Sequence, residues 1–236
     1  MNPTESSEPV PIWLASRIRR AALLSALCWL FPVAAVALLL AGIEAAWWFK
    51  EMESTFIPLF WNAVFLGLLY LFGREFFTRI WIFLRPELSE EAAYLRRFGT
   101  LTDVVNRVEG ELQDPAHPTF GKEVAFTENW LIVSGGRRFA LRRLDDLIWV
   151  FLKKSTTRLN AVIPIWRSNW VAFHSADGPD VEAKCSPEQG TKLLEHAAQR
   201  CPWIVLGHDE AKGKLWESDR AAFVAAVQDR KKGGAR

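Results

Sequence analysis

Four side chains in the last quarter of the chain are of types that bind zinc. They are Cys185, His196, Cys201 and His208. Structural zinc sites usually hold their ligands in close pairs, such as two cysteines separated by two to four residues, and this spacing is absent here. Cys185 alternates with Val181 and Ala183, which is typical of a cysteine packed in a strand. The sequence therefore predicts no metal site.

Two adjacent carboxylates, Asp145 and Asp146, are candidates for acid–base chemistry. They directly precede an apolar stretch that begins at Leu147, so turn residues are the simpler interpretation. The sequence contains no glycine-rich phosphate loop, no Gly-x-Ser-x-Gly elbow and no His-Glu-x-x-His motif. We therefore expect no catalytic residues and no cofactor, and we expect that the protein is not an enzyme.

Basic side chains cluster in the middle of the chain and form the candidate binding surface. They are Arg137, Arg138, Arg142, Arg143, Lys153, Lys154 and Arg158. If several share one face, they can bind lipid headgroups or a protein partner, while ordinary solvated strand surface is the alternative. The net charge is only +2 and no nucleic-acid-binding motif is visible, so nucleic acid is not an expected partner.

Two long apolar runs lie near the N-terminus. Residues 21–43, AALLSALCWLFPVAAVALLLAGI, and residues 54–73, STFIPLFWNAVFLGLLYLFG, contain no charged residue. As helices they would extend about 35 Å and about 30 Å, enough to cross a hydrocarbon core of about 30 Å. We predict a transmembrane hairpin. A pair of buried core helices is the alternative, and a cleaved signal peptide is disfavoured because its apolar region is usually shorter.

The connection between the runs, EAAWWFKEMEST at residues 44–55, is expected to be the tip of this hairpin. Its aromatic residues suit the headgroup level, and its charged residues suit water. The aromatic residues are Trp47, Trp48 and Phe49, and the charged ones beside them are Lys50, Glu51 and Glu53.

The distribution of basic residues predicts the orientation of the hairpin. Three arginines precede the first run and three follow the second, namely Arg17, Arg19, Arg20, Arg74, Arg79 and Arg85. The tip carries a single basic residue, Lys50. Because Lys and Arg in short loops remain in the cytoplasm, we predict a multi-pass protein of the bacterial inner membrane with both termini cytoplasmic. Three widely spaced cysteines suit that reducing compartment.

Residues 74–118 are expected to be a helical connector. In REFFTRIWIFL, apolar residues recur at helical spacing among arginines, which indicates an amphipathic continuation of the second helix. Pro86 should interrupt it, and Ser89 should cap a short helix that ends at Gly99. A further helix is expected from about Thr102 to Gln113. Its apolar side would carry Val104, Val105, Val108 and Leu112.

From Lys122 the pattern has a period of two, which is typical of strands. Seven strands are expected, over EVAFT, WLIVSG, RRFALRR, DLIWVFLKK, RLNAVIPIW, NWVAFHS and DVEAKCS. Their inward positions would be Trp130, Ile132, Phe139, Leu141, Trp149, Phe151, Val171 and Phe173. A helix opened by Pro187 follows. Seven antiparallel strands followed by one helix is the order of a pleckstrin-homology-like (PH-like) fold.

Two stretches, FTENWLIVSGGRRFALRRLDDLIWVF and RCPWIVLGHDEAKGKLWESDRAAFVAAV, resemble PH-like domains of bacterial membrane proteins. The resemblance covers about residues 90–230, and the two apolar runs match as well. Many eukaryotic PH-like domains bind phosphoinositides through basic residues in the first inter-strand loop. Here that loop is Glu128-Asn129 and carries no basic residue, so this role is not carried over.

The expected organisation is therefore an α+β membrane protein: a two-helix transmembrane hairpin and a PH-like seven-stranded antiparallel domain with a capping helix. The segments are 1–20 cytoplasmic, 21–73 hairpin, 74–118 connector, 119–207 PH-like domain, and 208–236 C-terminal helix with a basic tail.

The expected function is a binding or scaffold module for a protein partner or membrane lipids at the inner membrane face. The alternative is an oligomeric channel or membrane-perturbing effector gated by a ligand, although the runs contain no charged pore-lining residue. Asn62, the lone amide of the second run, can hydrogen-bond across helices and so keeps a homo-oligomer open.

Overall fold

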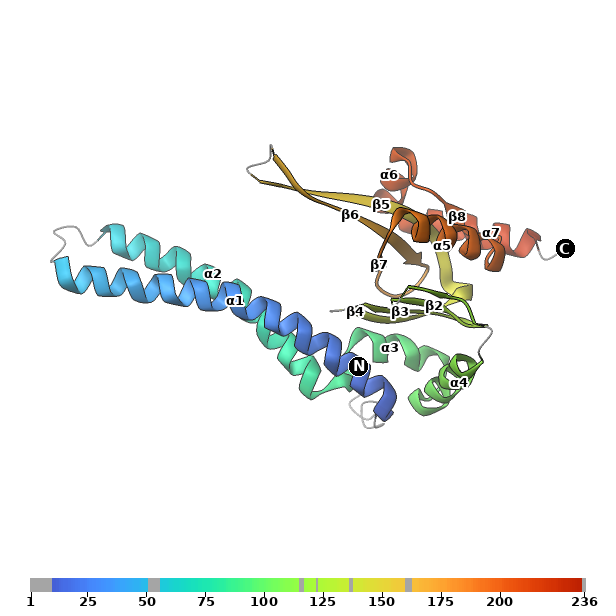
Figure 1. Cartoon of the computed structure of the whole chain (residues 1–236), viewed down its shortest axis with the longest axis horizontal. Helices are drawn as coiled ribbons and strands as arrows, with labels where there is room; N and C mark the ends of the chain where they lie inside the picture. Colours follow the sequence, from blue (N-terminus) through green and yellow to red (C-terminus); the bar gives the residue numbers. More distant parts are fainter. Residues whose placement is uncertain are drawn as a thin grey trace. The chain divides into compact units, whose positions relative to one another are not determined.

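The computed structural model of the 236-residue chain describes residues 10–50, 56–114, 117–121, 123–135, 138–159 and 163–234. The fold is α+β: long apolar helices come first, and two β-sheets with further helices follow (Figure 1). The chain divides into two compact units. The first extends to Ser89, and the second begins at Glu90 and contains both sheets except for Arg138, which groups with the first unit.

The first unit consists of α1 (Ile12–Lys50), α2 (Phe56–Leu84) and the short helix η1 (Pro86–Leu88). The two long helices pack against each other in opposite directions, and the rings of Trp29 and Phe72 lie 5.9 Å apart (Figure 1). α2 ends two residues before Pro86, as the predicted break requires.

The predicted tip at residues 44–55 is too long, because α1 continues through Glu44 to Lys50. Residues 45–50 include no glycine or proline, so none of them favours the end of a helix. Residues 51–55 lie outside the described residues, as do the side chains of Trp47, Trp48 and Phe49.

The second unit opens with α3 (Glu90–Leu95), η2 (Arg96–Phe98) and α4 (Leu101–Gln113). Three of the four residues predicted for the apolar side of α4 are buried, namely Val104, Val105 and Val108, while Leu112 is half-buried. The Thr100 hydroxyl caps α4 by accepting a hydrogen bond from the Asp103 amide at 3.2 Å. Gly99 ends the preceding turn with φ 132°, a backbone conformation that favours glycine.

Two four-stranded sheets follow. The first contains β1 (Thr119–Phe120), β2 (Val124–Phe126), β3 (Trp130–Gly135) and β4 (Arg138–Arg143) in sequential order. After η3 (Leu144–Asp146), the second contains β5 (Leu147–Leu159), β6 (Ile163–Ser175), β7 (Val181–Cys185) and β8 (Val205–Leu206), in the order β7-β6-β5-β8. β8 is parallel to β5, whereas β5, β6 and β7 pair antiparallel.

The predicted strand at residues 158–166 is wrong as a separate element. Its two ends belong to β5 and β6, which run for 13 residues each and pair over their length. β7 pairs only with Asn169–Phe173, and β8 only with Trp149 and Val150. The far halves of β5 and β6 therefore extend beyond the other strands of their sheet (Figure 1). The short strands β1 and β8 were not predicted.

The main core joins the inner faces of both sheets. Phe126, Leu131 and Val133 from the first sheet pack with Val150 and Phe173 from the second. α5 (Pro187–Arg200) adds Leu193 and Ala197 to this core. Ser186 begins α5 with a reciprocal capping box to Gln189, and Pro187 occupies the first turn as predicted.

A second cluster lies on the outer face of the second sheet. Trp149 and Phe151 pack there with Phe223 and Val227 of α7 (Arg220–Gly234), and Trp216 of α6 (Glu210–Ser218) joins them. All eight predicted inward positions are buried. However, only Val171 and Phe173 belong to the core between the sheets. Trp149 and Phe151 belong to the outer cluster, because helices cover that face and bury both sides of the strand. The prediction was also wrong for the first sheet, where the core contains Leu131, Val133 and Ala140 in place of the predicted Trp130, Ile132, Phe139 and Leu141.

Candidate functional site

The surface of the long helices is apolar and exposed. Among the described residues, six exposed large apolar side chains lie on the middle of α1 and nine on α2. They are Leu23, Leu27, Leu30, Phe31, Leu38, Leu39, Phe60, Trp61, Val64, Leu66, Tyr70, Leu71, Phe77, Trp81 and Leu84. A water-soluble protein rarely exposes an apolar surface of this kind, so the surface indicates a binding or membrane-facing region.

One helix in the described part of the chain, over Ile12–Ala45, is long and apolar enough to cross a membrane. Only 11% of its apolar window is buried inside the protein, whereas a core helix would be mostly buried. α2 is helical as predicted, but its second half contains the charged residues Arg74, Glu75 and Arg79.

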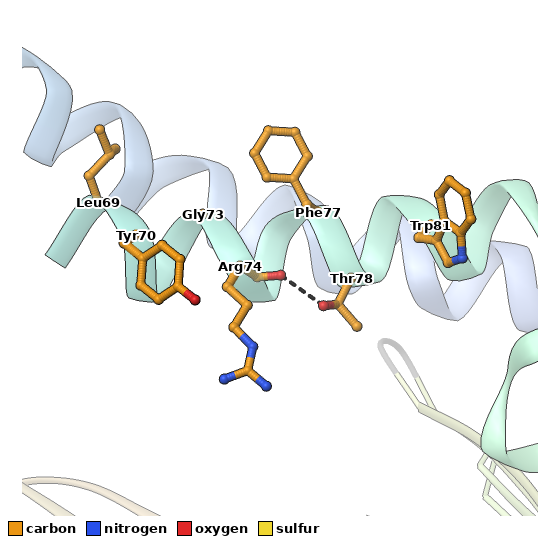
Figure 2. Close-up of a pocket in the computed structure, with 7 residues that line it drawn as sticks. All are labelled: Leu69, Tyr70, Gly73, Arg74, Phe77, Thr78 and Trp81. Carbon is orange, nitrogen blue, oxygen red and sulfur yellow. Dashed lines mark hydrogen bonds between the residues drawn. The ribbon is translucent and has the colours of Figure 1, made fainter. Parts of the chain in front are cut away.

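A groove of about 540 Å³ lies along α2 where its uncharged run ends. It is lined by Leu69, Tyr70, Gly73, Arg74, Phe77, Thr78 and Trp81. Figure 2 shows Tyr70 and Arg74 projecting side by side, while Phe77 points away from them. The Thr78 hydroxyl donates to the Arg74 carbonyl at 2.8 Å, and the Arg85 guanidinium lies over the Trp81 ring at 4.7 Å. Aromatic and basic side chains mixed in this way are typical of a membrane–water boundary.

The side chain of Asn62 on α2 forms a hydrogen bond to α1. Its Nδ2 donates to Oε1 of Glu44 on α1 at 2.6 Å, and its Oδ1 is buried. The amide is therefore turned toward the neighbouring helix and does not present a free group to a second copy.

Arg142, one of the seven candidate basic residues, is buried and has a structural role. Its side chain is 1% exposed and forms an ion pair with Glu91 of α3, with nitrogen–oxygen distances of 2.7 Å and 3.0 Å. It also donates to the Pro179 carbonyl and lies 4.8 Å from the centre of the Tyr94 ring. Burial raises the pKa of Glu91, although the charge of Arg142 acts in the opposite direction. Arg142 is thus unavailable to a ligand.

Of the other basic candidates among the described residues, two form ion pairs. Arg143 pairs with Asp145 at 3.1 Å and covers the Phe98 ring, and Lys153 pairs with Glu182 at 2.8 Å. Lys154 is exposed where β5 and β6 leave the sheet, and Arg138 is exposed at the start of β4. Arg137 and the side chain of Arg158 lie outside the described residues.

The two adjacent carboxylates bind structural partners. Asp145 accepts from Nζ of Lys231 at 2.7 Å, and this hydrogen bond lowers the pKa of Asp145. Asp146 accepts from the Tyr94 hydroxyl at 2.7 Å. Both contacts agree with the interpretation of these residues as structural.

The zinc-type side chains are also placed by packing. Burial raises the pKa of the Cys201 thiol to about 12, and burial likewise raises that of Cys185. His196 packs against the Phe126 ring at 4.9 Å, and His208 stacks on Trp149 at 5.5 Å. In the described residues, no group of three or more His, Cys, Asp or Glu side chains is arranged to hold a metal ion.

Sequence reasoning missed two groups that organise the second unit. One is the pair Glu91–Arg142, and the other is the ring cluster of Trp149, His174 and Trp216, in which His174 lies 5.1 Å and 4.8 Å from the two tryptophans. In each group the partners are far apart in the chain, so no local spacing could have indicated them.

No protein-family model matches this chain, and neither the curated proteins nor the solved structures contain a significant match to it.

Proposed function

We propose that this chain is an integral protein of the bacterial inner membrane whose second unit is a PH-like cytoplasmic module that binds lipid headgroups or a protein partner. The observation that carries the proposal is the exposed apolar surface of α1 and α2. An apolar helix that is only 11% buried over its most apolar window lacks the protein neighbours of a core helix, and lipid is the solvent that suits it.

The PH-like part of the proposal draws support from the order of elements. Four sequential strands form one sheet, three antiparallel strands β5–β7 follow, and α5 then packs its apolar side into the core between the sheets. The chain departs from that pattern by adding the parallel strand β8 and the helices α6 and α7. The loop between β2 and β3 remains short, and the basic residues lie elsewhere.

Membrane anchoring and orientation are tested together. Alkaline carbonate extraction should leave the full chain in the membrane pellet. An enzyme reporter that is active only outside the cytoplasm should be silent after Arg236 and active when inserted near Glu51. This orientation is expected because arginines lie before residue 21 and after residue 73, whereas a single lysine lies near the tip. Activity from the Arg236 fusion would refute the cytoplasmic placement, and release by carbonate would refute anchoring.

The lipid part of the binding role is expected to depend on Lys154. A fragment of residues 90–236 should sediment with anionic vesicles, less so with added salt, and Lys154→Ala should weaken binding about fivefold. A basic residue near an anionic surface contributes about 1 kcal/mol, which corresponds to that factor. Arg230→Ala, which removes another exposed cation on α7, is the matched control and should change little. Equal sedimentation with neutral vesicles, or none with either, would leave a protein partner as the ligand.

A further inference from the structure

A carboxyl group from one long helix and an amide from the other meet away from both helix ends, where the Glu44 side chain is exposed and that of Asn62 is half-buried. Nδ2 of Asn62 donates to Oε1 of Glu44 at 2.6 Å. Oδ1 of Asn62 is buried and has no hydrogen-bond partner in the described part of the chain. At 1.5 Å per residue, Glu44 lies about 9 Å before the end of α1, and Asn62 lies about 9 Å after the start of α2. The residues between this pair and the two helix ends, 45–49 and 56–61, are apolar.

The packing of the helices decides which part of them suits a hydrocarbon layer. Trp29 lies level with Phe72, so a layer centred on residues 21–43 of α1 would also contain Arg74, Glu75 and Arg79 of α2. A layer over residues 56–73 of α2 faces about residues 29–49 of α1, where Glu44 is the single charged residue. Because each charge inside a bilayer is costly, the second placement is favoured. It puts Glu44 and Asn62 inside the layer.

We infer that Glu44 and Asn62 form a proton-binding site within the membrane, an inference that rests on the proposed membrane anchoring. A proton adds to the free oxygen of the Glu44 carboxylate. The resulting O–H donates to Oδ1 of Asn62, while Nδ2 of Asn62 continues to donate to the other carboxyl oxygen. The amide and the acid then satisfy each other. This arrangement removes both the charge and the unpaired buried oxygen, each of which is costly in hydrocarbon.

The surroundings of the pair leave the proton to these two residues. Residues 56–73 of α2 contain no titratable acid or base that faces Glu44, apart from the phenol of Tyr70 further along the helix. On α1 the next charged residue is Lys50, at the helix end. Glu51 and Glu53 follow it in the segment outside the described residues. Since Oδ1 of Asn62 is buried between the helices, a second copy of the chain cannot supply its donor.

Infrared spectroscopy of the full chain in lipid nanodiscs tests the inference directly. At neutral pH, Glu44→Gln should abolish a C=O stretching band of a protonated carboxylic acid, and Asn62→Leu should shift that band without abolishing it. Glu75→Gln, which removes an exposed carboxylate 3.8 Å from Arg79, is the matched control and should leave the band unchanged. A spectrum in which Glu44→Gln removes only ionised carboxylate bands would overturn the inference.

Chemical modification separates failure of this inference from failure of the anchoring. A hydrophobic carbodiimide should modify Glu44, whereas a water-soluble carbodiimide with a soluble amine should modify Glu51 and Glu53 and leave Glu44 unmodified. If carbonate releases the protein from membranes, anchoring itself fails. If the protein stays in the membrane and the water-soluble reagent modifies Glu44 as readily as Glu51, the carboxyl lies in water and the proton site is disproved.

Discussion

Glu91→Ala is expected to lower the free energy of unfolding of residues 90–236 by about 3–5 kcal/mol, because it leaves the buried guanidinium of Arg142 without its carboxylate. The carboxylate of Glu91 also accepts from the Leu141 amide at 3.2 Å, so a strand edge loses its partner as well. The measurement is urea unfolding followed by tryptophan fluorescence, compared at equal m-values.

Two further variants decide whether burial of the charge is the cause. Arg143→Ala breaks an ion pair whose side chains are 36% and 50% exposed, so it should cost less than about 1 kcal/mol. Combining Glu91→Met with Arg142→Met removes both charges and should recover part of the loss. A small effect of Glu91→Ala would mean that water reaches Arg142 in solution.

Trp149→Ala is expected to lower the free energy of unfolding of the same fragment by about 3–5 kcal/mol, as for other large buried aromatics. Trp149 is 1% exposed, and its indole N–H donates to the Gly207 carbonyl at 2.7 Å. It contacts rings from the strands and from the C-terminal helices, including Phe151 at 4.4 Å and Phe223 at 5.5 Å. Thermal unfolding followed by circular dichroism provides the measurement.

Trp149→Phe serves as the conservative comparison, because it retains the ring packing and loses the indole hydrogen bond. The free energy of unfolding of Trp149→Phe should lie between those of the wild type and Trp149→Ala. Leu206→Ala, at a residue that is 39% exposed on β8, should have a small effect. An unchanged melting temperature for Trp149→Ala would show that the outer cluster does not pack in solution.

The helices and most strands could be predicted because their signals are local. Pro187 marks a helix start through its fixed φ angle, and the spacing of Val104, Val105 and Val108 marks an apolar helix side; the structure places α5 and α4 accordingly. The limits of α1 could not be predicted from charge alone. Helical geometry does not stop at a charged residue, and the chain continues in a helix past Glu44.

The sequence could not predict which side of each strand faces the core between the sheets, or which basic residues stay free of carboxylates, for a different reason. Alternation reveals which positions share a face, but when helices cover the outer face both sets are buried, as Val150 and Trp149 are. A run of arginines reveals charge, but whether a carboxylate from elsewhere neutralises it depends on tertiary structure. Arg142 meets Glu91 only after α3 packs on β4.

The helices that cover Trp149 and Phe151 come after β5 and β6 in the chain, and this order matters during synthesis. While the ribosome is still translating α6 and α7, strands β5 and β6 have already been made, and their outer aromatic face has nothing to pack on. Domains generally fold as units during synthesis, and transiently exposed apolar surface favours aggregation. A stop codon between β6 and Phe223 would make this transient state permanent, so nonsense changes there should deplete the protein as severely as changes in its core.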